Sequence, residues 1–320
     1  MPKVSIVIPV YKVEKYIAEC AKSLFEQTLD DIEYIFVNDC TPDESIEVLL
    51  EVLQQYPNRK PQVKIINHKK NLGAAIARKN GILAATGKYI IHCDSDDWAE
   101  PKMYQLLYEK AKEENLDIVI SSYIEKCTDS AVIHEQNLGD NPFSKIISSP
   151  ILCSLWNKLV RRDIINWNNV LYPSHHMMED AVLCAQMFYF AKKVGYVNQP
   201  LYYYRVNDDS ICHISTEEGD LKRWNEAFEN VKIIEHFLKQ EQADKRYKNV
   251  LIQSKANVRG FLMPQLQKNN KYYKLWYNTF PELNRQYLFA KGPSISIKVI
   301  FLLTLLRIYP YMHQILKALK

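Results

Sequence analysis

The sequence predicts an α/β protein with a doubly wound, mostly parallel central sheet and a C-terminal helical region, and three observations lead there. Short apolar runs rich in β-branched residues recur along the first hundred residues, a pattern typical of strands buried on both faces. Segments with helical spacing of apolar residues separate these runs. Polar residues follow where the runs end. In such sheets ligands bind beyond the carboxyl ends of the strands, so these polar segments predict the functional site.

The predicted elements follow one another in a regular order along the first two thirds of the chain. The predicted strands are 4–8, 34–37, 63–66, 89–93, 117–122, an edge strand at 130–136, and a last strand at 202–205. The predicted helices are 14–28, a helix capped by Thr41 and started by Pro42, 73–85, 101–114, and a helix that starts at Glu179. This regular alternation predicts one α/β domain over 1–215, with halves 1–100 and 101–215.

Composition and charge narrow the class of protein. The chain of 320 residues is 47% hydrophobic and 24% charged, as in ordinary globular proteins. Its net charge of +4 is too small to indicate nucleic acid as a partner. Seven cysteines without a CxxC pair favour reduced thiols over disulfides or zinc. Met1 leads directly into the first strand without a basic region or cleavage site, so we expect a cytoplasmic protein.

An acidic cluster follows the fourth predicted strand. Asp94, Asp96 and Asp97 place three carboxylates within four residues. Like charges this close repel unless water, a cation or strong donors compensate them. Hard oxygen ligands at a strand end suit Mg²⁺ or Mn²⁺, which completes its shell with substrate phosphates. The alternative is an acidic turn that caps the helix predicted to start at Pro101.

The glycine pattern limits how a nucleotide can bind. The first strand runs into Pro9-Val10-Tyr11-Lys12, and neither GxGxxG nor GxxxxGK[ST] occurs. A dinucleotide fold or a P-loop is therefore not predicted. The remaining possibility is a nucleotide held by side chains: an aromatic ring for the base, Asp39 for a base N–H, and a cation that bridges the diphosphate.

Four segments together resemble the family 2 glycosyltransferases of the GT-A fold. These segments are VSIVIPVY (4–11), FVNDCTPD (36–43), NLGAAIARKNG (71–81) and DSDD (94–97). The resemblance implies sugar transfer from a nucleotide-sugar, usually a UDP-sugar, with Mg²⁺ or Mn²⁺ and inversion at the anomeric carbon. Asn38, Cys40 and Pro42 depart from the usual family residues, but Asp39 is retained.

The resemblance also implies roles for single residues of the first half. The matching positions are Pro9, Tyr11 and Asp39 for uracil, Arg78 for the donor phosphates, and Asp94 and Asp96 for ribose and metal. From the residues alone, the alternative for Tyr11 is a strand-end aromatic packed on a helix. The alternative for Arg78 is a solvated helix charge, and His68 is expected in a solvated loop.

The second half contains the predicted catalytic base. Glu179-Asp180 at a helix start resembles the family's Glu-Asp motif, whose Asp is the usual base. Inverting transfer needs a base for the acceptor hydroxyl and forms no covalent intermediate. The alternative is N-terminal capping, because acids favour the positive end of a helix. After the last strand, Arg205 and His213 are candidates to reach the diphosphate, His213 as a metal ligand.

The C-terminal region, 216–320, changes character and is predicted to be helical. From Leu283 to the end there are six Lys or Arg and no Asp or Glu. Its longest apolar run, 297–306, is far short of the roughly 20 residues that span a bilayer. The composition of 295–320 predicts peripheral contact with an anionic inner leaflet. The alternative is a helix pair, interrupted by Pro310, that packs on the catalytic domain.

The sequence therefore predicts a metal-dependent inverting glycosyltransferase that acts on a glycan or a lipid-linked glycan precursor. Asp220 stands where processive synthases carry the Gln of QxxRW, which favours single additions. A different class, a non-catalytic nucleotide-sugar or glycan-binding module on the same fold, predicts the loss of a metal-binding or base carboxylate. Asp94, Asp96 and Asp180 are all present.

Overall fold

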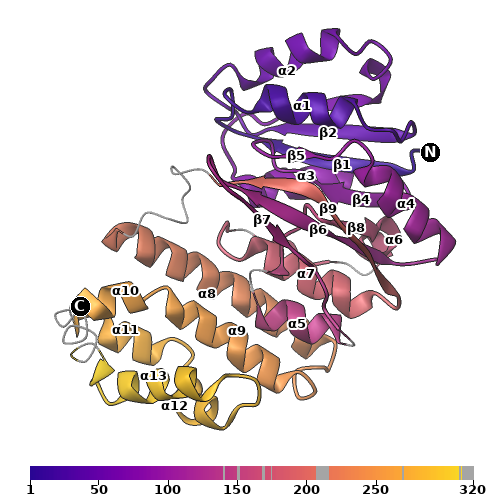
Figure 1. Ribbon diagram of the computed structural model, residues 1–320. Coiled ribbons are helices and arrows are strands. Elements are labelled where there is room, and N and C mark those ends of the chain that lie inside the picture. The colour runs from indigo at the N-terminus through magenta and orange to yellow at the C-terminus, as the bar shows by residue number, and fades with distance from the viewer. Residues whose placement is uncertain are drawn as a thin grey trace.

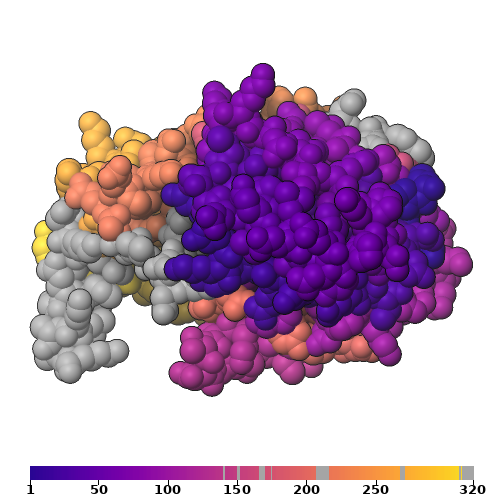
Figure 2. Space-filling model, turned by 90° about the horizontal axis from the view of Figure 1, so that it is seen from above, coloured from indigo at the N-terminus to yellow at the C-terminus, as the bar shows by residue number. Residues whose placement is uncertain are grey.

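The computed structural model describes residues 1–139, 141–149, 152–167, 170–173, 175–206, 216–268, 270–309 and 311. A twisted sheet carries α1 (Ile17–Phe25) and α2 (Ser45–Gln54) on one side, and the C-terminal helices lie on the other (Figure 1). Seen from above, the N-terminal segments cover most of the visible face, and C-terminal helices appear beside them (Figure 2).

Four parallel strands form the N-terminal half of the sheet, as predicted. They are β1 (Val4–Val10), β2 (Ile32–Asn38), β3 (Val63–Asn67) and β4 (Tyr89–His92), in the order β3-β2-β1-β4. Because they are parallel, their carboxyl ends meet at one edge. Polar residues after β1, β2 and β4 are therefore brought together there.

The second half extends the same sheet with strands of both directions. These strands are β8 (Lys158–Arg161), β6 (Ile118–Lys126), β9 (Val194–Arg205) and β5 (Trp98–Ala99), with β7 (Ala131–His134) paired to β6. β8 is antiparallel to both β4 and β6, whereas β6 and β9 are parallel. The predicted α/β class is confirmed, and β7 is the expected edge strand.

Two predicted helix starts are wrong. α2 begins at Ser45, because the Thr41 hydroxyl donates to Asp43 at 2.5 Å and Asp43 accepts from the Ser45 amide at 3.3 Å. This side-chain turn replaces the expected cap at Thr41. α4 (Met103–Glu113) begins after Pro101, since Trp98–Ala99 pairs with β9 instead. The strand-end acids therefore do not cap that helix.

The sheet separates two hydrophobic cores. Alternate residues of β1 point to opposite faces, so Ile6 and Ile8 join one core and Val7 joins the other. The first core packs against α1, α2 and α4. The second packs against α3 (Ala74–Ala84), α5 (Pro142–Ser148) and α7 (Glu179–Phe190), with α6 (Arg162–Trp167) at its border.

The C-terminal helices belong to the second core. They are α8 (Glu217–Gln240), α9 (Lys248–Gly260), α10 (Met263–Lys268), α11 (Tyr273–Asn278), α12 (Leu283–Gln286) and α13 (Ile295–Leu305). Val182 of α7, Val231 of α8 and Trp276 of α11 are members of one buried cluster. The predicted boundary at residue 215 lies between β9 and α8, but the hydrophobic core is continuous across it.

No helix in the described ranges has the length and hydrophobicity that a bilayer span requires. α13 nevertheless exposes large apolar side chains, with Ile295 82% and Ile297 49% exposed. Only its buried side, through Phe301, packs on Tyr287 and Trp276. Residues 310 and 312–320 of the predicted amphipathic tail lie outside the described part.

Candidate active site

The site is organised around one buried arginine. Arg78 of α3 pairs through Nη2 with Asp94 Oδ1 at 2.6 Å and through Nη1 with Glu179 Oε1 at 2.5 Å. Its residue is only 7% exposed, so the alternative of a solvated helix charge is wrong. The guanidinium links the end of β4 to the start of α7. Because Arg78 and Glu179 are 101 residues apart, the sequence does not reveal this contact. Its contact with donor phosphates stays a prediction.

The carboxylates after β4 have different surroundings: Asp97 is hydrogen-bonded within the fold, and Asp96 has a raised pKa. Asp97 is buried and accepts hydrogen bonds from the Tyr202 hydroxyl at 2.8 Å and the Arg205 amide at 2.8 Å. It therefore fixes β9 to the acidic loop. Burial, followed by the charge of Asp94, raises the pKa of Asp96 to about 6. Arg205 and Arg78 offset part of this rise, and a bound cation would favour the ionised Asp96 further.

The protein side chains near the end of β4 offer few metal ligands, which fits a cation coordinated mainly by substrate phosphates. No group of three or more His, Cys, Asp or Glu side chains is arranged for a metal ion within the described residues. Asp94 and Asp96 supply two carboxylates, and Mg²⁺ commonly uses one or two together with substrate phosphates. His213, the predicted further ligand, lies outside the described residues.

The helix-start pair has polar atoms without partners. Glu179 Oε2 and Asp180 Oδ1 are buried and have no hydrogen-bond partner among the described residues. Burial is the main cause that raises the pKa of Glu179 to about 8 and that of Asp180 to about 6. Met178, just before them, has a left-handed φ of 65°. Buried unsatisfied oxygens and backbone strain are both typical of functional sites.

Capping alone does not account for this pair. The N-cap of α7 is Met178, and no side chain caps the helix. The preceding loop is pressed against the start of α3, where Gly73 has a φ of 88° and a Cβ would lie 2.8 Å from His176 Nε2. A side chain at Gly73 would therefore require the His176 ring, three residues before Glu179, to move, and the left-handed φ would itself strain any other residue there.

The predicted nucleotide residues lie near the ends of β1 and β2. Tyr11 is 39% exposed, so part of its ring is accessible to a ligand. Pro9 pairs in register with Val37. Asp39 is buried and accepts hydrogen bonds from Leu72 N at 2.8 Å and Gly73 N at 2.7 Å. Its contact with a base stays a prediction, and a base N–H would share an oxygen with these donors.

Sequence reasoning missed His68 as a partner of Asp39. Its Nδ1 lies 2.7 Å from Asp39 Oδ1, and its Nε2 lies 2.8 Å from Asn80 Nδ2. The expected solvated loop is wrong at this residue, because the His68 side chain is only 6% exposed. The only signal in the sequence was its position directly after the third strand.

Arg205 is engaged away from the predicted diphosphate. Its Nε donates to the Asp96 carbonyl at 2.9 Å, and its guanidinium lies 4.5 Å from the Trp98 ring centroid. It also pairs with Glu19. A role at the diphosphate stays a prediction, and it would require the guanidinium to leave these partners.

Lys158 is a second missed residue. It is 1% exposed, and its Nζ donates to the Ser154 carbonyl at 2.6 Å and Asn157 Oδ1 at 2.8 Å. The neighbouring Cys153 carbonyl accepts from Cys184 Sγ at 3.0 Å, one turn along α7 from Asp180. The charge of Arg78, and to a smaller extent that of Lys158, lowers the pKa of Asp180 and opposes the larger effect of burial. A lysine inside an apolar strand was the available signal.

Carboxylates thus follow two of the parallel strands, and the buried Arg78 joins the cluster after β4 to the acidic start of α7. The structure is similar to S. aureus TarS 1-349 in complex with UDP-GlcNAc, with a TM-score of 0.73 at 16% identity. The match covers 99% of this chain and 92% of that one. The fold is thus the predicted GT-A fold.

The family follows from the sequence itself. The family model for glycosyl transferase family 2 matches residues 5–152, and the chain belongs to this family of glycosyltransferases. The chain is 34% identical over 228 residues to the uncharacterized glycosyltransferase EpsJ of Bacillus subtilis, covering 67% of this chain. It spans 64% of the length of that relative.

A third similarity extends into the C-terminal helices. The poly(ribitol-phosphate) beta-glucosyltransferase of Bacillus spizizenii is 27% identical over 317 residues. The match covers 94% of this chain and 48% of the relative. Shared sequence therefore includes the helical region that the family model leaves uncovered.

Proposed function

We propose that this chain is a metal-dependent, inverting glycosyltransferase that moves a sugar from a UDP-sugar to an acceptor hydroxyl. The observation that carries the proposal is the Arg78 bridge between Asp94 and Glu179. It joins the candidate donor carboxylates to the candidate base within one buried network. Such a junction suits a reaction in which donor and acceptor meet at one atom.

Asp180 acts as the general base in this proposal. As the acceptor oxygen attacks the anomeric carbon, Asp180 accepts the hydroxyl proton and the nucleoside diphosphate leaves from the opposite face. A pKa of about 6 leaves the Asp180 carboxylate ionised at neutral pH while keeping it basic enough to accept a proton. Asp180 Oδ1 has no hydrogen-bond partner among the described residues, which supports its assignment to the acceptor hydroxyl.

Asp94 and Asp96 would hold Mg²⁺ or Mn²⁺ together with the diphosphate of the donor. The cation supplies positive charge where the departing diphosphate becomes more negative. Asp97 has a supporting role, because its oxygens already accept from Tyr202 and Arg205. Asp94 in turn is held by Arg78, which fixes its direction.

The uridine end of the donor is proposed to lie at Pro9, Tyr11 and Asp39. The exposed ring of Tyr11 is available to stack on a base. The Asp39 carboxylate is held in one orientation by two backbone amides and His68. A fixed acceptor of this kind favours a base that offers an N–H, as uracil does.

The acceptor is proposed to be a surface-glycan precursor, either a phosphate-containing polymer or a lipid-linked glycan. The similarity to a poly(ribitol-phosphate) glucosyltransferase across the helical region supports an acceptor with phosphodiester groups.

Peripheral attachment to the inner leaflet is proposed for the segment 295–311. Its exposed Ile295, Ile297 and Leu306 supply apolar surface, and Lys298 and Arg307 supply positive charge toward anionic lipid. Flotation with anionic vesicles tests this part. We expect Ile295→Glu/Ile297→Glu to abolish flotation, whereas Leu83→Glu, an equally exposed apolar site on α3, should not. Flotation unaffected by the first pair would refute it.

A panel of UDP-, GDP- and dTDP-sugars, with Mn²⁺ or EDTA, tests the whole proposal. We expect UDP release from a UDP-sugar only with the divalent cation, and none in Asp96→Asn. Equal turnover in EDTA would refute the metal role, and preference for GDP- or dTDP-sugars would refute the donor.

A further inference from the structure

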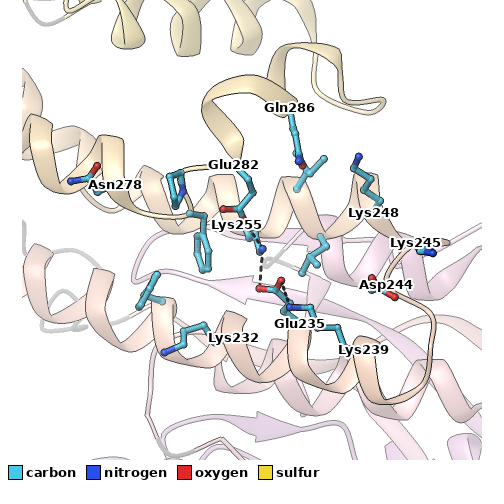
Figure 3. A pocket seen from close by; sticks show the side chains of 15 residues that line it. Lys232, Glu235, Lys239, Asp244, Lys245, Lys248, Lys255, Asn278, Glu282 and Gln286 are labelled. Carbon is cyan, nitrogen blue, oxygen red and sulfur yellow. Dashed lines mark hydrogen bonds and ion pairs between the residues drawn. The ribbon is translucent and has the colours of Figure 1, made fainter.

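A pocket of about 600 Å³ lies within the C-terminal helices, away from the candidate active site (Figure 3). Helices α8 and α9 form two of its walls, and residues 278–286 close the third. Phe228, Leu251, Ile252 and Phe280 give it an apolar floor. The charged side chains reach it from all three walls, as the labelled lysines and glutamates in Figure 3 show.

Helix α8 separates this pocket from the loop that carries the candidate base. On one face, Asn230 Nδ2 donates to the carbonyls of His175 at 2.9 Å and Met177 at 2.8 Å. Phe228 and Lys232, each two residues from Asn230, face the pocket. Because two residues span about 200° of a helix, the two sites lie on opposite faces. They are about one helix diameter, roughly 10 Å, apart.

The acids of the pocket are largely committed to one buried lysine. Lys255 is 5% exposed and lies 2.9 Å from Glu235 Oε2 and 2.6 Å from Glu282 Oε1. Lys239 also lies 2.9 Å from Glu235. Figure 3 shows these groups meeting at the centre of the pocket. Glu235 and Glu282 thus hold the walls together rather than facing a ligand, whereas the third acid, Asp244, lies beside Lys245 at the rim.

The rim is left with positive charge. Lys245 and Lys248 are exposed at the turn that leads into α9, and no acid lies within ion-pair distance of either among the described residues. Five lysines and three acids line the whole pocket. A lysine ammonium is a point charge that suits phosphate oxygens, and the apolar floor suits the carbon skeleton of a polyol.

We propose that this lysine pocket binds phosphodiester groups of the acceptor polymer while a hydroxyl further along the polymer reaches Asp180. The inference rests on the proposed function and adds to it the place where the acceptor chain is held. A second contact across α8 from the loop that precedes the base would retain a repetitive anionic acceptor by combining two weak sites.

The test uses the full chain and a synthetic tetramer of glycerol phosphate as the probe. Inorganic phosphate and a neutral tetrasaccharide serve as comparison ligands, all measured by calorimetry at low salt. Lys245→Glu/Lys248→Glu reverses the rim charge, and Lys245→Gln/Lys248→Gln removes it. Lys60→Glu/Lys112→Glu is the matched control, since both lysines are exposed and lie in the N-terminal half.

We expect the tetramer to bind wild type and the control equally. The charge-reversed pair should bind it at least tenfold more weakly, with the neutral pair between them, because two charge contacts are lost and then made repulsive. Binding should weaken with added salt. The neutral tetrasaccharide should show no such difference between variants.

Three results would overturn the inference: no binding of the tetramer to wild type, equal binding to the charge-reversed pair, or inorganic phosphate binding as tightly as the tetramer. UDP affinity with Mn²⁺ is measured on the same proteins. Failure of the proposed function appears as no UDP binding in wild type, whereas failure of this inference leaves UDP binding intact.

Discussion

The two acidic clusters on either side of Arg78 have the same chemistry and different surroundings. At the strand end, Asp97 is satisfied by Tyr202 and Arg205, and Asp94 by Arg78. At the helix start, Glu179 and Asp180 each keep a buried oxygen without a partner among the described residues. Carboxylates whose orientation is fixed by hydrogen bonds and ion pairs can form a rigid cation site. Carboxylates with an unpartnered oxygen can accept a proton from a substrate hydroxyl.

The largest expected effect is on turnover, and it comes from a substitution in the helix-start cluster. Asp180→Asn should lower turnover by about 10²–10⁴-fold, the usual contribution of a positioned base, because the amide cannot accept the hydroxyl proton. Asp163→Asn, an acid in the first turn of α6, is the matched control and should stay within twofold of wild type. Steady-state assays of UDP release measure both. Turnover within tenfold of wild type in Asp180→Asn would remove the base assignment.

A second prediction breaks the link between the clusters. Arg78→Met should lower the free energy of unfolding by about 3–5 kcal/mol, because two partly buried carboxylates lose their shared cation. The free energy of unfolding of Arg78→Lys should lie between those of wild type and Arg78→Met, since an ammonium cannot span both acids as a guanidinium does. Urea denaturation gives both values. An unchanged midpoint in Arg78→Met would show that the bridge contributes nothing to stability.

The pH dependence of stability provides a third, smaller effect. The folded-state pKa of Asp180 is raised to about 6, so the folded protein holds this proton more tightly than the unfolded chain does. Stability from this group is therefore present at low pH and is lost as pH rises from about 4 to 6. Asp180→Asn should flatten the pH–stability curve by about 3 kcal/mol over that window, because the pKa rises from 3.8 to about 6 and each pKa unit corresponds to about 1.4 kcal/mol. Parallel curves for the two proteins would contradict the raised pKa.

The smallest effect concerns the satisfied cluster. Tyr202→Phe removes the hydroxyl that donates to Asp97 and accepts from the Asp94 amide, and should cost about 1–2 kcal/mol with little change in turnover. Tyr203→Phe, at the adjacent and more exposed position, should cost less than about half of that. Thermal unfolding compares them. An equal loss of stability in both variants would mean that the hydrogen bond to Asp97 contributes no more than the hydrogen bond of Tyr203 to Glu100.

The two clusters also differ in how far sequence reasoning reaches. The sheet, the strand-end acids and the helix-start pair follow from local patterns, because apolar runs and the polar residues after them are adjacent in the chain. The Arg78–Glu179 pair spans 101 residues, and no local pattern predicts it.

The other differences between the predictions and the structure come from contacts that form only when the chain is folded. His68 was placed in solvent because its neighbours are lysines, yet β3 carries it beside Asp39. α2 starts late because the Asp43 side chain competes for the backbone and the Thr41 hydroxyl. The lysine pocket joins residues of α8, α9 and the segment before α12, which sequence alone does not bring together.

The affinity of UDP in the presence of Mn²⁺, measured by calorimetry on Asp180→Asn and Asp96→Asn, tests the division between the clusters most directly. The account predicts wild-type affinity in Asp180→Asn. In Asp96→Asn it predicts affinity at least tenfold weaker and no longer enhanced by the cation. If Asp180→Asn loses affinity as strongly as Asp96→Asn, both acids belong to the donor site and the assignment of separate roles is wrong.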